Sequence, residues 1–363
     1  MTWPLLFFSC TLILFIIPLL PALIEWYRGS DAKPLQVVRA YDGDIRYFAV
    51  RFRQLLDDNL PGLTQGKLAA ETPSQGNLGR DTYQLVPPGS QPVFGTLEKM
   101  GQTSKQMVLG IGSLQLPENF FFEREVYAFG RIECGRRSSF RVILAEDEIR
   151  LADDCDVVRW AHSNTRISVG RMSRLYGRIS AEEQIRLDRD TRFVRMHAPQ
   201  IYFGVASDLS GSDTFRPPLS PNPLAAPDTL LDNTEERWLV GGSLDVPAGT
   251  LHAGSLVAKG DLSIAEGSCI QGSLSGPRLQ LAANVHVRGA IVADGDIHIG
   301  PGCRIAGPIV SEGKVTIAAG SCIGTLDVPT TITAHEIRIE EGVLAHGSVW
   351  ARELGFVAPR QHS

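Results

Sequence analysis

Aromatic residues are scarce in this chain, at 7% of 363 residues, and none of its six cysteines forms a CxxC pair or a zinc-like spacing. A disulfide framework or a zinc ribbon is therefore not indicated, and single buried thiols in a reducing compartment are the better interpretation. The chain also lacks a large excess of positive or negative charge, because its formal net charge is only −5. The chain thus offers no general attraction to nucleic acid. Glycine (36) and proline (22) are plentiful, which favours short strands joined by tight turns.

No basic residue precedes the longest apolar run. Residues 5–24 read LLFFSCTLILFIIPLLPALI without a charge, and as a helix they would span about 30 Å, the thickness of a bilayer core. A signal peptide needs a basic start and a small-x-small cleavage site, and both are missing. We therefore predict a transmembrane anchor over residues 1–27. Six basic residues follow within residues 28–53, so the positive-inside rule places the C-terminal bulk of the chain in the cytoplasm.

The next two segments differ in composition. Residues 28–60 carry apolar side chains at helical spacing with arginines between them, which predicts a juxtamembrane amphipathic helix. Such a helix could lie on membrane lipid through its arginines, or it could pack on the rest of the chain or on another copy. Residues 61–119 begin with a stretch rich in Gly, Pro, Gln, Ser and Thr, and we expect a flexible linker and lead-in there.

Short apolar-x-apolar units recur with a period close to 18 residues, and a repeat of this kind decides the fold. In a first array, predicted over residues 120–205, the unit Ile149-x-Leu151 returns at Ile167-x-Val169 and Ile185-x-Leu187. In a second array, predicted over residues 236–357, the units begin at Leu244, Leu262, Leu279, Ile297, Val315 and Ile337. The last interval is 22, which implies a four-residue insertion near Asp327–Thr331.

Glycines follow the units of the second array at one fixed position, where a left-handed turn is expected. They are Gly249, Gly267, Gly302, Gly320 and Gly342. The period, the alternation and the glycine turns together predict an all-β fold, a parallel β-solenoid with three short strands in each coil. Coils would rise by about 4.8 Å, the spacing of strands in a sheet. Ile299 should face the interior and stack on Leu281 and Ile317.

A proline-rich stretch separates the two arrays. Residues 206–235 contain five prolines, and we interpret them as an insertion in one continuous solenoid. The alternative is a linker between two separate solenoids. In one continuous solenoid, the unit Ile201-x-Phe203 before the insertion and the unit Trp238-x-Val240 after it could lie on neighbouring strands or on a shared one. Residues 358–363 would form a short tail.

Two runs in the second array carry a family resemblance. GDLSIAEGSCIQGSL (260–274) and GDIHIGPGCRIAGPIVSEGKVTIAAGSCIG (295–324) resemble the bactofilins, polymer-forming cytoskeletal proteins of bacteria. The resemblance implies a right-handed parallel β-helix, head-to-tail self-assembly, membrane association and recruitment of envelope-associated proteins. The general preference for right-handed crossovers agrees with that handedness. The chain departs from the bactofilin pattern in its length, its second array and its proline-rich insertion.

Together these features predict a membrane-anchored, self-assembling cytoskeletal scaffold. It would be a single-pass protein of the bacterial inner membrane with its solenoid in the cytoplasm. Its expected partners are other copies in a head-to-tail homopolymer, membrane lipid and unidentified envelope-associated proteins, without nucleic acid.

The main alternative is an enzyme built from hexapeptide repeats on a left-handed β-helix, since 18 is three times six. Such acyltransferases use a catalytic histidine, and related carbonic anhydrases bind zinc through three histidines. The eight histidines of this chain occupy scattered positions relative to the units, so they predict neither arrangement. A secreted polysaccharide lyase conflicts with the charge asymmetry of the anchor. We therefore expect no catalytic residue, no metal and no cofactor.

The predicted contact between copies lies at the C-terminal end of the solenoid. A parallel solenoid cannot pair the backbone groups of its last coil from within, so an open edge is a template for another chain. Little sequence remains after the last unit to cover this edge. Large apolar side chains commonly anchor interfaces. The candidate residues are Trp350, Leu354, Phe356 and Val357.

Overall fold

The computed structural model describes residues 45–67, 73–204, 224–234 and 236–360, together with Trp3 and Phe7. Residues 45–363 form a compact unit separate from residues 1–44, and the following description concerns that unit alone. Of the expected membrane anchor, only Trp3 and Phe7 belong to the described part. Within that part of the chain, no helix has both the length and the apolar character needed to cross a membrane.

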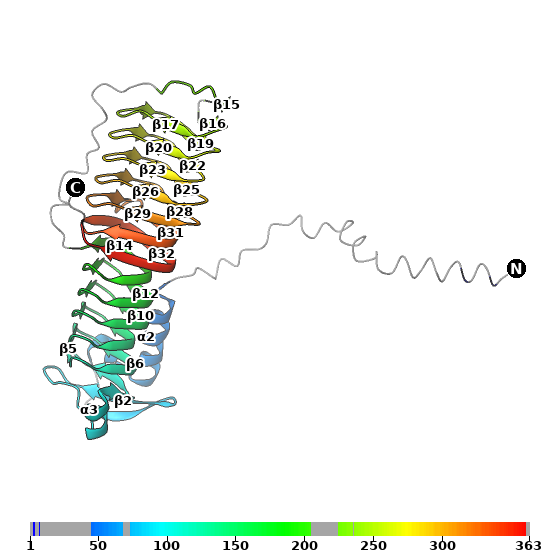
Figure 1. Cartoon of the computed structure of the whole chain (residues 1–363). Coiled ribbons are helices and arrows are strands. Elements are labelled where there is room, and N and C mark those ends of the chain that lie inside the picture. Colours follow the sequence, from blue (N-terminus) through cyan, green and yellow to red (C-terminus); the bar gives the residue numbers. More distant parts are fainter. Residues whose placement is uncertain are drawn as a thin grey trace. The chain divides into compact units, whose positions relative to one another are not determined.

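The chain folds into a β-solenoid of about 13 turns with a spacing of about 18 residues per turn. Figure 1 shows the coils stacked one on the next. The described strands all join one hydrogen-bonded sheet of 32 strands that winds around a single interior. The prediction of an all-β solenoid with this period is therefore confirmed. Within residues 45–360, the helical segments that the structure describes are α2 (Tyr47–Asn59), the 3₁₀ turn η2 (Leu63–Gln65) and α3 (Thr96–Gly101).

The first array combines long, bent strands with short ones. Its strands are β1 (Gln75–Leu78), β2 (Asp81–Val86), β3 (Thr103–Ser104), β4 (Met107–Gly110), β5 (Leu114–Leu116), β6 (Phe121–Ala128), β7 (Ile132–Cys134), β8 (Ser139–Ala145), β9 (Ile149–Leu151), β10 (Asp156–Ser163), β11 (Arg166–Val169), β12 (Arg174–Ala181), β13 (Gln184–Leu187) and β14 (Arg192–Phe203). The long strands turn a corner at a β-bulge, so each covers two sides of its coil.

The second array has three short strands in each coil, as predicted, until its last two strands, which are long. Its strands are β15 (Leu230–Asn233), β16 (Arg237–Val240), β17 (Leu244–Val246), β18 (Leu251–His252), β19 (Ser255–Ala258), β20 (Leu262–Ile264), β21 (Cys269–Ile270), β22 (Leu274–Gly276), β23 (Leu279–Leu281), β24 (His286–Val287), β25 (Ile291–Ala293), β26 (Ile297–Ile299), β27 (Arg304–Ile305), β28 (Ile309–Ser311), β29 (Lys314–Ile317), β30 (Cys322–Ile323), β31 (Thr330–Glu340) and β32 (Val343–Ala358).

Equivalent residues of successive coils stack in parallel register. Ile299 of β26 pairs with Leu281 of β23 and with Ile317 of β29, and all three side chains are fully buried. The predicted stacking of Ile299 is thus confirmed. The interior is a continuous aliphatic column in which each side chain packs against its counterparts one coil above and one coil below, and this repeated burial stabilises the fold.

Small polar residues, among them Ser173 and Ser321, occupy one inner corner of the coils. Ser321 Oγ donates to the carbonyl oxygen of Gly300 at 3.0 Å and accepts the N–H of Cys303 at 3.1 Å. Ser173 Oγ accepts the N–H of Cys155 at 3.1 Å in the same way. These hydroxyls satisfy backbone groups that the turns would otherwise leave buried without partners.

The predicted left-handed turns are present in the second array, where Gly267 has φ +70° and Gly302 has φ +71°. The inserted residues are also where the sequence predicts them. Ile323 still pairs with Ile305 at the normal interval, whereas Ile332 pairs with Ile309 at a longer one. The extra residues therefore form the loop 324–329.

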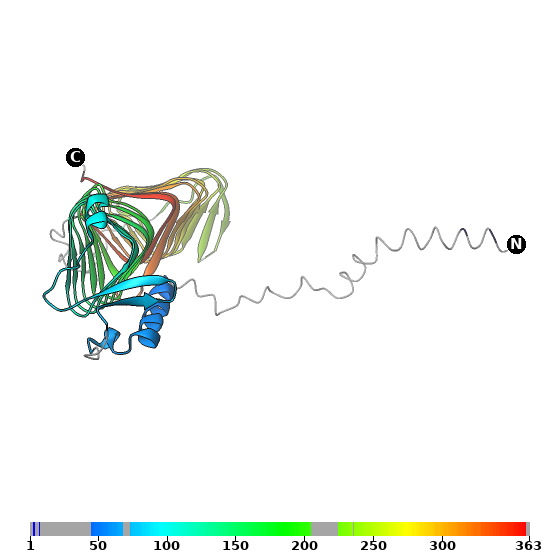
Figure 2. The same ribbon diagram turned by 90° about the horizontal axis from the view of Figure 1, so that it is seen from below.

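Helix α2 packs on a flank of the first array, as Figure 2 shows. Its buried Phe52 lies against Tyr127, with ring centroids 6.4 Å apart. Arg53 Nε lies 2.7 Å from Glu146 Oε1, and both side chains are mostly buried. Tyr127 donates its hydroxyl to the same carboxylate at 3.0 Å. Burial and the charge of Glu146 raise the pKa of Tyr127. Of the three predicted locations for the amphipathic helix, the structure shows packing on the solenoid of the same chain.

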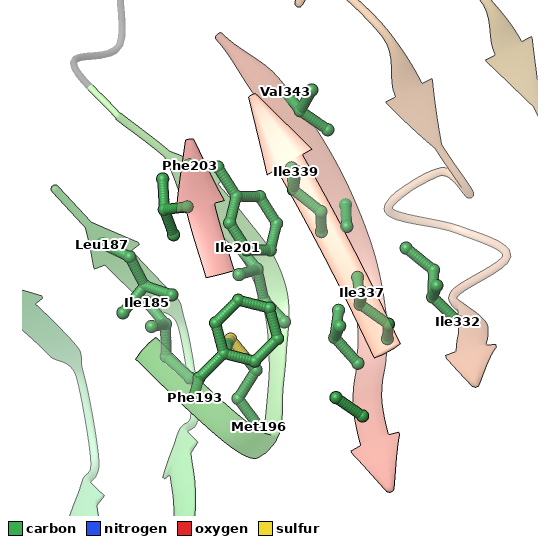
Figure 3. Packing of buried hydrophobic residues seen from close by; sticks show 14 of the residues in the cluster. Ile185, Leu187, Phe193, Met196, Ile201, Phe203, Ile332, Ile337, Ile339 and Val343 are labelled. Atoms are coloured by element: carbon green, nitrogen blue, oxygen red, sulfur yellow. The ribbon is translucent and has the colours of Figure 1, made fainter. Parts of the chain in front are cut away.

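The two arrays meet through their last coils, although the chain runs in opposite directions in the two. β14 pairs antiparallel with β32, with Arg192 opposite Phe356 and Phe203 opposite Val343. Figure 3 shows Phe203 and Ile339 directed into the same interior. The result is one hydrophobic core that continues through the antiparallel junction from the first array into the second.

This arrangement corrects three predictions. Residues 73–119 are not a flexible linker, because they form strands β1 to β5 and helix α3. The units around the proline-rich segment are not neighbours: β14 pairs with β13 and β32, whereas β16 pairs with β15 and β19. The predicted insertion 206–235 also contains β15. Apolar alternation identifies strands but not which strands pair, and here the direction of the coils reverses between the arrays.

Candidate functional site at the solenoid ends

The C-terminal coil does not present the open edge that the sequence predicts. Val357 is fully buried, and its N–H donates to the carbonyl oxygen of Thr191 at 2.9 Å. Phe356 lies opposite Arg192 across the junction, and the guanidinium of Arg338 lies 5.7 Å from its ring centroid. The predicted open edge is wrong, because strand β14 of the same chain already occupies it.

Trp350 and Leu354 lie on the flank of the junction rather than at an end of the solenoid. Their exposed fractions are 41% and 40%. The guanidinium of Arg195 lies 5.0 Å from the centroid of the Trp350 ring. Burial and the neighbouring Arg178 lower the pKa of Arg195. These two side chains can therefore contribute to a lateral contact but not to stacking of coils.

One row of paired strands runs through the whole molecule and ends in an unpaired edge on each side. The row passes through β5, β7, β9, β11, β13, β14, β32, β30, β27, β24, β21 and β18. Within the described residues, β5 pairs only with β7 and β18 only with β21. The outer edges of β5 and β18 are thus the two ends of a single face.

The hydrogen bonds that β5 and β18 make to their one neighbouring strand show which of their backbone groups point away from it. In β5, the N–H of Leu114 and the carbonyl of Leu116 bond toward β7, so the N–H and carbonyl of Gln115 point outward. In β18, the carbonyl of His252 bonds toward β21, so the groups of Leu251 point outward. Each end therefore presents at least one donor and one acceptor.

The outer end of the second array contains a further unsatisfied group. His252 of β18 is 8% exposed, its ring lies 5.0 Å from that of Trp238, and its Nε2 has no hydrogen-bond partner among the described residues. Burial lowers the pKa of His252. β15 pairs antiparallel with β16 and covers one side of this coil, while Leu224 and Leu230 pack against the core.

The outer end of the first array is closed more completely. β1 pairs antiparallel with β2 and covers its edge. Phe94 packs on Phe120 with ring centroids 4.4 Å apart, and Phe122 lies 6.2 Å from Phe94. These rings close the interior, so only the edge of the coil, and not its core, remains available at β5.

The structure shows a group of side chains with the spacing of metal ligands, which the sequence analysis did not anticipate. It consists of His335, Glu336 and Glu353, all exposed, at the bulge between β31 and β32. Lys314 lies 3.9 Å from Glu336. Only pairing across the two strands brings His335 and Glu353 together, so linear spacing gives no signal for this group.

Comparisons with protein-family models, with curated proteins and with solved structures found no match to this chain.

Proposed function

We propose that this protein is a membrane-anchored structural scaffold of the bactofilin type that assembles end to end. The observation that carries the proposal is the row of strands from β5 to β18, which among the described residues leaves one unpaired edge at each end of the same face. An unpaired edge is a template for another strand. A heterologous contact between two different ends repeats without closing and produces a filament.

The junction supplies the geometry for this contact. β14 and β32 pair antiparallel because the two arrays run in opposite directions. β18 and β5 belong to the same two arrays and the same face, so β18 of one copy meets β5 of the next in the antiparallel sense. The N–H and carbonyl groups of Gln115 and Leu251 then find partners. The buried Nε2 of His252 lies in the coil that such a contact covers.

The remaining parts of the proposal are supported by the sequence. The uncharged run of residues 5–24 favours a single transmembrane helix, and the basic residues after it favour a cytoplasmic solenoid. The general preference for right-handed parallel crossovers favours right-handed winding, as the resemblance implies. The long solenoid flank gives envelope-associated proteins a regular surface.

A proline at each edge tests the proposal. Gln115→Pro and Leu251→Pro each remove an outward N–H and leave the bonds to the neighbouring strand unchanged, because those are made by adjacent residues. The full-length protein in detergent is examined by electron microscopy and sedimentation. We expect the wild-type protein to form filaments and each variant to remain monomeric. Gln115→Thr, which keeps the N–H, is the matched control and should form filaments.

Mixing the two proline variants identifies the contact. Each variant keeps one functional end, so an equimolar mixture should contain dimers but nothing longer. Dimers of Gln115→Pro alone would show that β18 pairs with β18 of another copy, which contradicts the head-to-tail arrangement. A wild-type protein that stays monomeric at high concentration would rule out assembly through these edges.

A further inference from the structure

One flank of the second array carries a row of outward side chains that are small or apolar. Each member pairs in register with the next, so the row runs unbroken across seven strands. We call it the flank row. With about 4.8 Å between strands, it is roughly 30 Å long. From the outer end to the junction it consists of Leu239, Val257, Ser275, Val292, Val310, Thr333 and Trp350.

The flank row is uncharged, and its largest apolar members are exposed. Val292 and Trp350 are both 41% exposed, and Val310 is 36% exposed. None of the seven residues in the row is charged. At the outer end, where charged side chains adjoin the row, Arg237 lies 3.2 Å from Asp232, so the two charges neutralise each other. Exposed valines in an uncharged row favour an apolar partner, because covering them removes apolar surface from water.

The same flank of the first array is already an interface. The flank row continues into that array, in register, as Arg195, Arg178 and Trp160. Helix α2 begins on this continuation, where Phe48 stacks on Trp160 with ring centroids 5.2 Å apart. The flank is therefore a surface that binds a covering element in the first array and remains exposed in the second.

The small side chains of the flank row favour a second sheet as its occupant. Helix α2 is held by the large rings of Trp160 and Tyr127, whereas valine, serine and threonine leave a flat, pleated surface. Two flat sheet faces pack about 10 Å apart with their strands nearly aligned, and β-branched residues suit such a contact. A membrane surface fits less well, because anionic lipid is attracted by basic residues and the row contains none. A second copy of this chain presents the matching face.

Helix α2 determines how two flank rows can meet. A helix is about 10 Å in diameter, which is also the distance between packed sheets. In a parallel pair, the two α2 helices would lie against each other and hold the rows apart. In an antiparallel pair, each α2 lies past the outer end of the other copy's second array, so the rows can touch. Such a pair is a two-fold contact, in which the same surface of both copies is used.

We propose that two copies of this chain pair antiparallel through their flank rows. Val292 of one copy faces Val310 of the other, which places the exposed valines at the centre of the contact. One strand further out, Ser275 faces Thr333. The contact uses neither β5 nor β18, so this proposal and end-to-end assembly can each fail without the other.

The size of the contact indicates how strongly it forms. At each edge of the pair Trp350 faces Val257, so six strands of each copy take part. Six strands, each about three to four residues wide, offer roughly 300–400 Å² of flat face per copy, against about 800 Å² per partner in a stable complex. Isolated copies therefore pair weakly and sediment as monomers. Filaments of the kind proposed above would pair along their length, because many weak contacts then act together.

Disulfide trapping tests the pair without filaments. Full-length Ser275→Cys and Thr333→Cys proteins are mixed in detergent and oxidised, with the wild-type protein as the background for its own cysteines. We expect a covalent dimer in the mixture, because facing positions of two packed sheets approach disulfide distance. Either variant alone should give at most about a tenth as much dimer, because the two copies of Ser275 lie three strands, about 14 Å, apart along the pair. Equal dimer from one variant alone would indicate a parallel pair, and no dimer in the mixture would rule out the contact.

A matched pair of residues on another face controls for chance collisions. Ser263 of β20 and Thr316 of β29 are also partly exposed and also belong to the second array. A mixture of Ser263→Cys and Thr316→Cys should give no more dimer than the wild-type protein. Dimer as abundant as from the flank row would contradict the assignment.

A charge at the centre of the flank row should prevent pairing. Val310→Lys places a lysine opposite Val292 of the other copy, and the two-fold symmetry does so twice in each pair. Added to both cysteine variants, it should lower the yield of covalent dimer at least about tenfold. Val158→Lys is the matched control, since Val158 of β10 is 43% exposed and lies outside the row. An unchanged yield with Val310→Lys, or an equal loss with Val158→Lys, would overturn the proposal.

Vesicles distinguish lipid as the occupant. A Val292→Cys variant of the full-length protein is placed in vesicles of phosphatidylcholine and phosphatidylglycerol at low protein density, and its thiol is labelled with a water-soluble maleimide. We expect the thiol to react as fast as that of Ser263→Cys, because the flank row is covered by a second copy and not by lipid. Protection of Val292→Cys alone would assign the flank row to the membrane surface and contradict pairing between copies.

Discussion

The first and second arrays build the same coil with different residues. At the left-handed turn position the second array mostly has glycine, as at Gly267 and Gly302. The first array has Asp154 and Met172 at the equivalent turns, with φ +58° at both. A side chain in this conformation costs about 1–2 kcal/mol relative to ordinary backbone. The coil therefore does not depend on glycine, and stacking of the interior is strong enough to impose the turn.

The two arrays also differ in what covers them. The first array contains stacked rings such as Phe122 on Phe140, 5.0 Å apart, and carries helix α2 on its flank. In the second array the same flank exposes Val292 and Val310, at 41% and 36%. The first array thus resembles a conventional domain with a second small core under α2, whereas the second array relies on its interior column alone.

The largest expected loss of stability comes from placing a charge in the interior, and it tests whether the interiors of the two arrays contribute equally to the unfolding free energy. Ile299→Asp in the second array and Ile185→Asp in the first each bury a carboxylate without a partner, since both isoleucines are fully buried. We expect each variant to lose roughly 4–5 kcal/mol of unfolding free energy. Urea unfolding followed by circular dichroism measures the loss. His298→Asp, beside Ile299 but exposed, is the control. A loss confined to one array's variant would mean that the interiors are not equivalent.

The comparison explains what the sequence could and could not predict. Alternation and glycine turns identified the coils, the inward position of Ile299 and the loop near Asp327, because these depend on residues close in the sequence. Within residues 73–119, Leu114-x-Leu116 does lie 18 residues before Ile132-x-Cys134, and the prediction missed it. Strand β2 was harder to predict, because Leu85 pairs with Leu109 at an interval of 24. The antiparallel junction depends on which coils meet, and periodicity is the same whichever way the second array runs.

A smaller loss of stability is expected when helix α2 loses its packing contact with the first array. Phe52→Ala removes a ring that is 4% exposed and packed on Tyr127. We expect a loss of about 3 kcal/mol, measured by urea unfolding, because such a truncation leaves a cavity. Leu55→Ala on the same helix is the control, since Leu55 is 42% exposed and should cost little. Equal losses in the two variants would indicate that α2 stabilises the first array in some way other than through its buried face.

The smallest effect comes from exchanging turn residues between the arrays. Met172→Gly should stabilise the protein by about 0.5 kcal/mol, because glycine relieves the left-handed conformation at the expense of some unfolded-state entropy. Gly267→Met should destabilise it by about 1 kcal/mol, and no atom lies within 4 Å of the added Cβ, so the cost is purely conformational. Thermal unfolding of both variants provides the measurement. Changes of the same sign in both would contradict the equivalence of the two turns.

The antiparallel junction has a consequence for synthesis. β14 is complete long before the ribosome adds β32, its partner across the junction. At ordinary rates of elongation this interval is on the order of 10 s. During that time β14 of the nascent chain pairs with β12 and β13 but has one open edge, which can accept a newly made β32 from a neighbouring chain. Chains translated side by side on one messenger therefore risk exchanging arrays, and an early closing contact by a chaperone or by the membrane would favour pairing within the same chain.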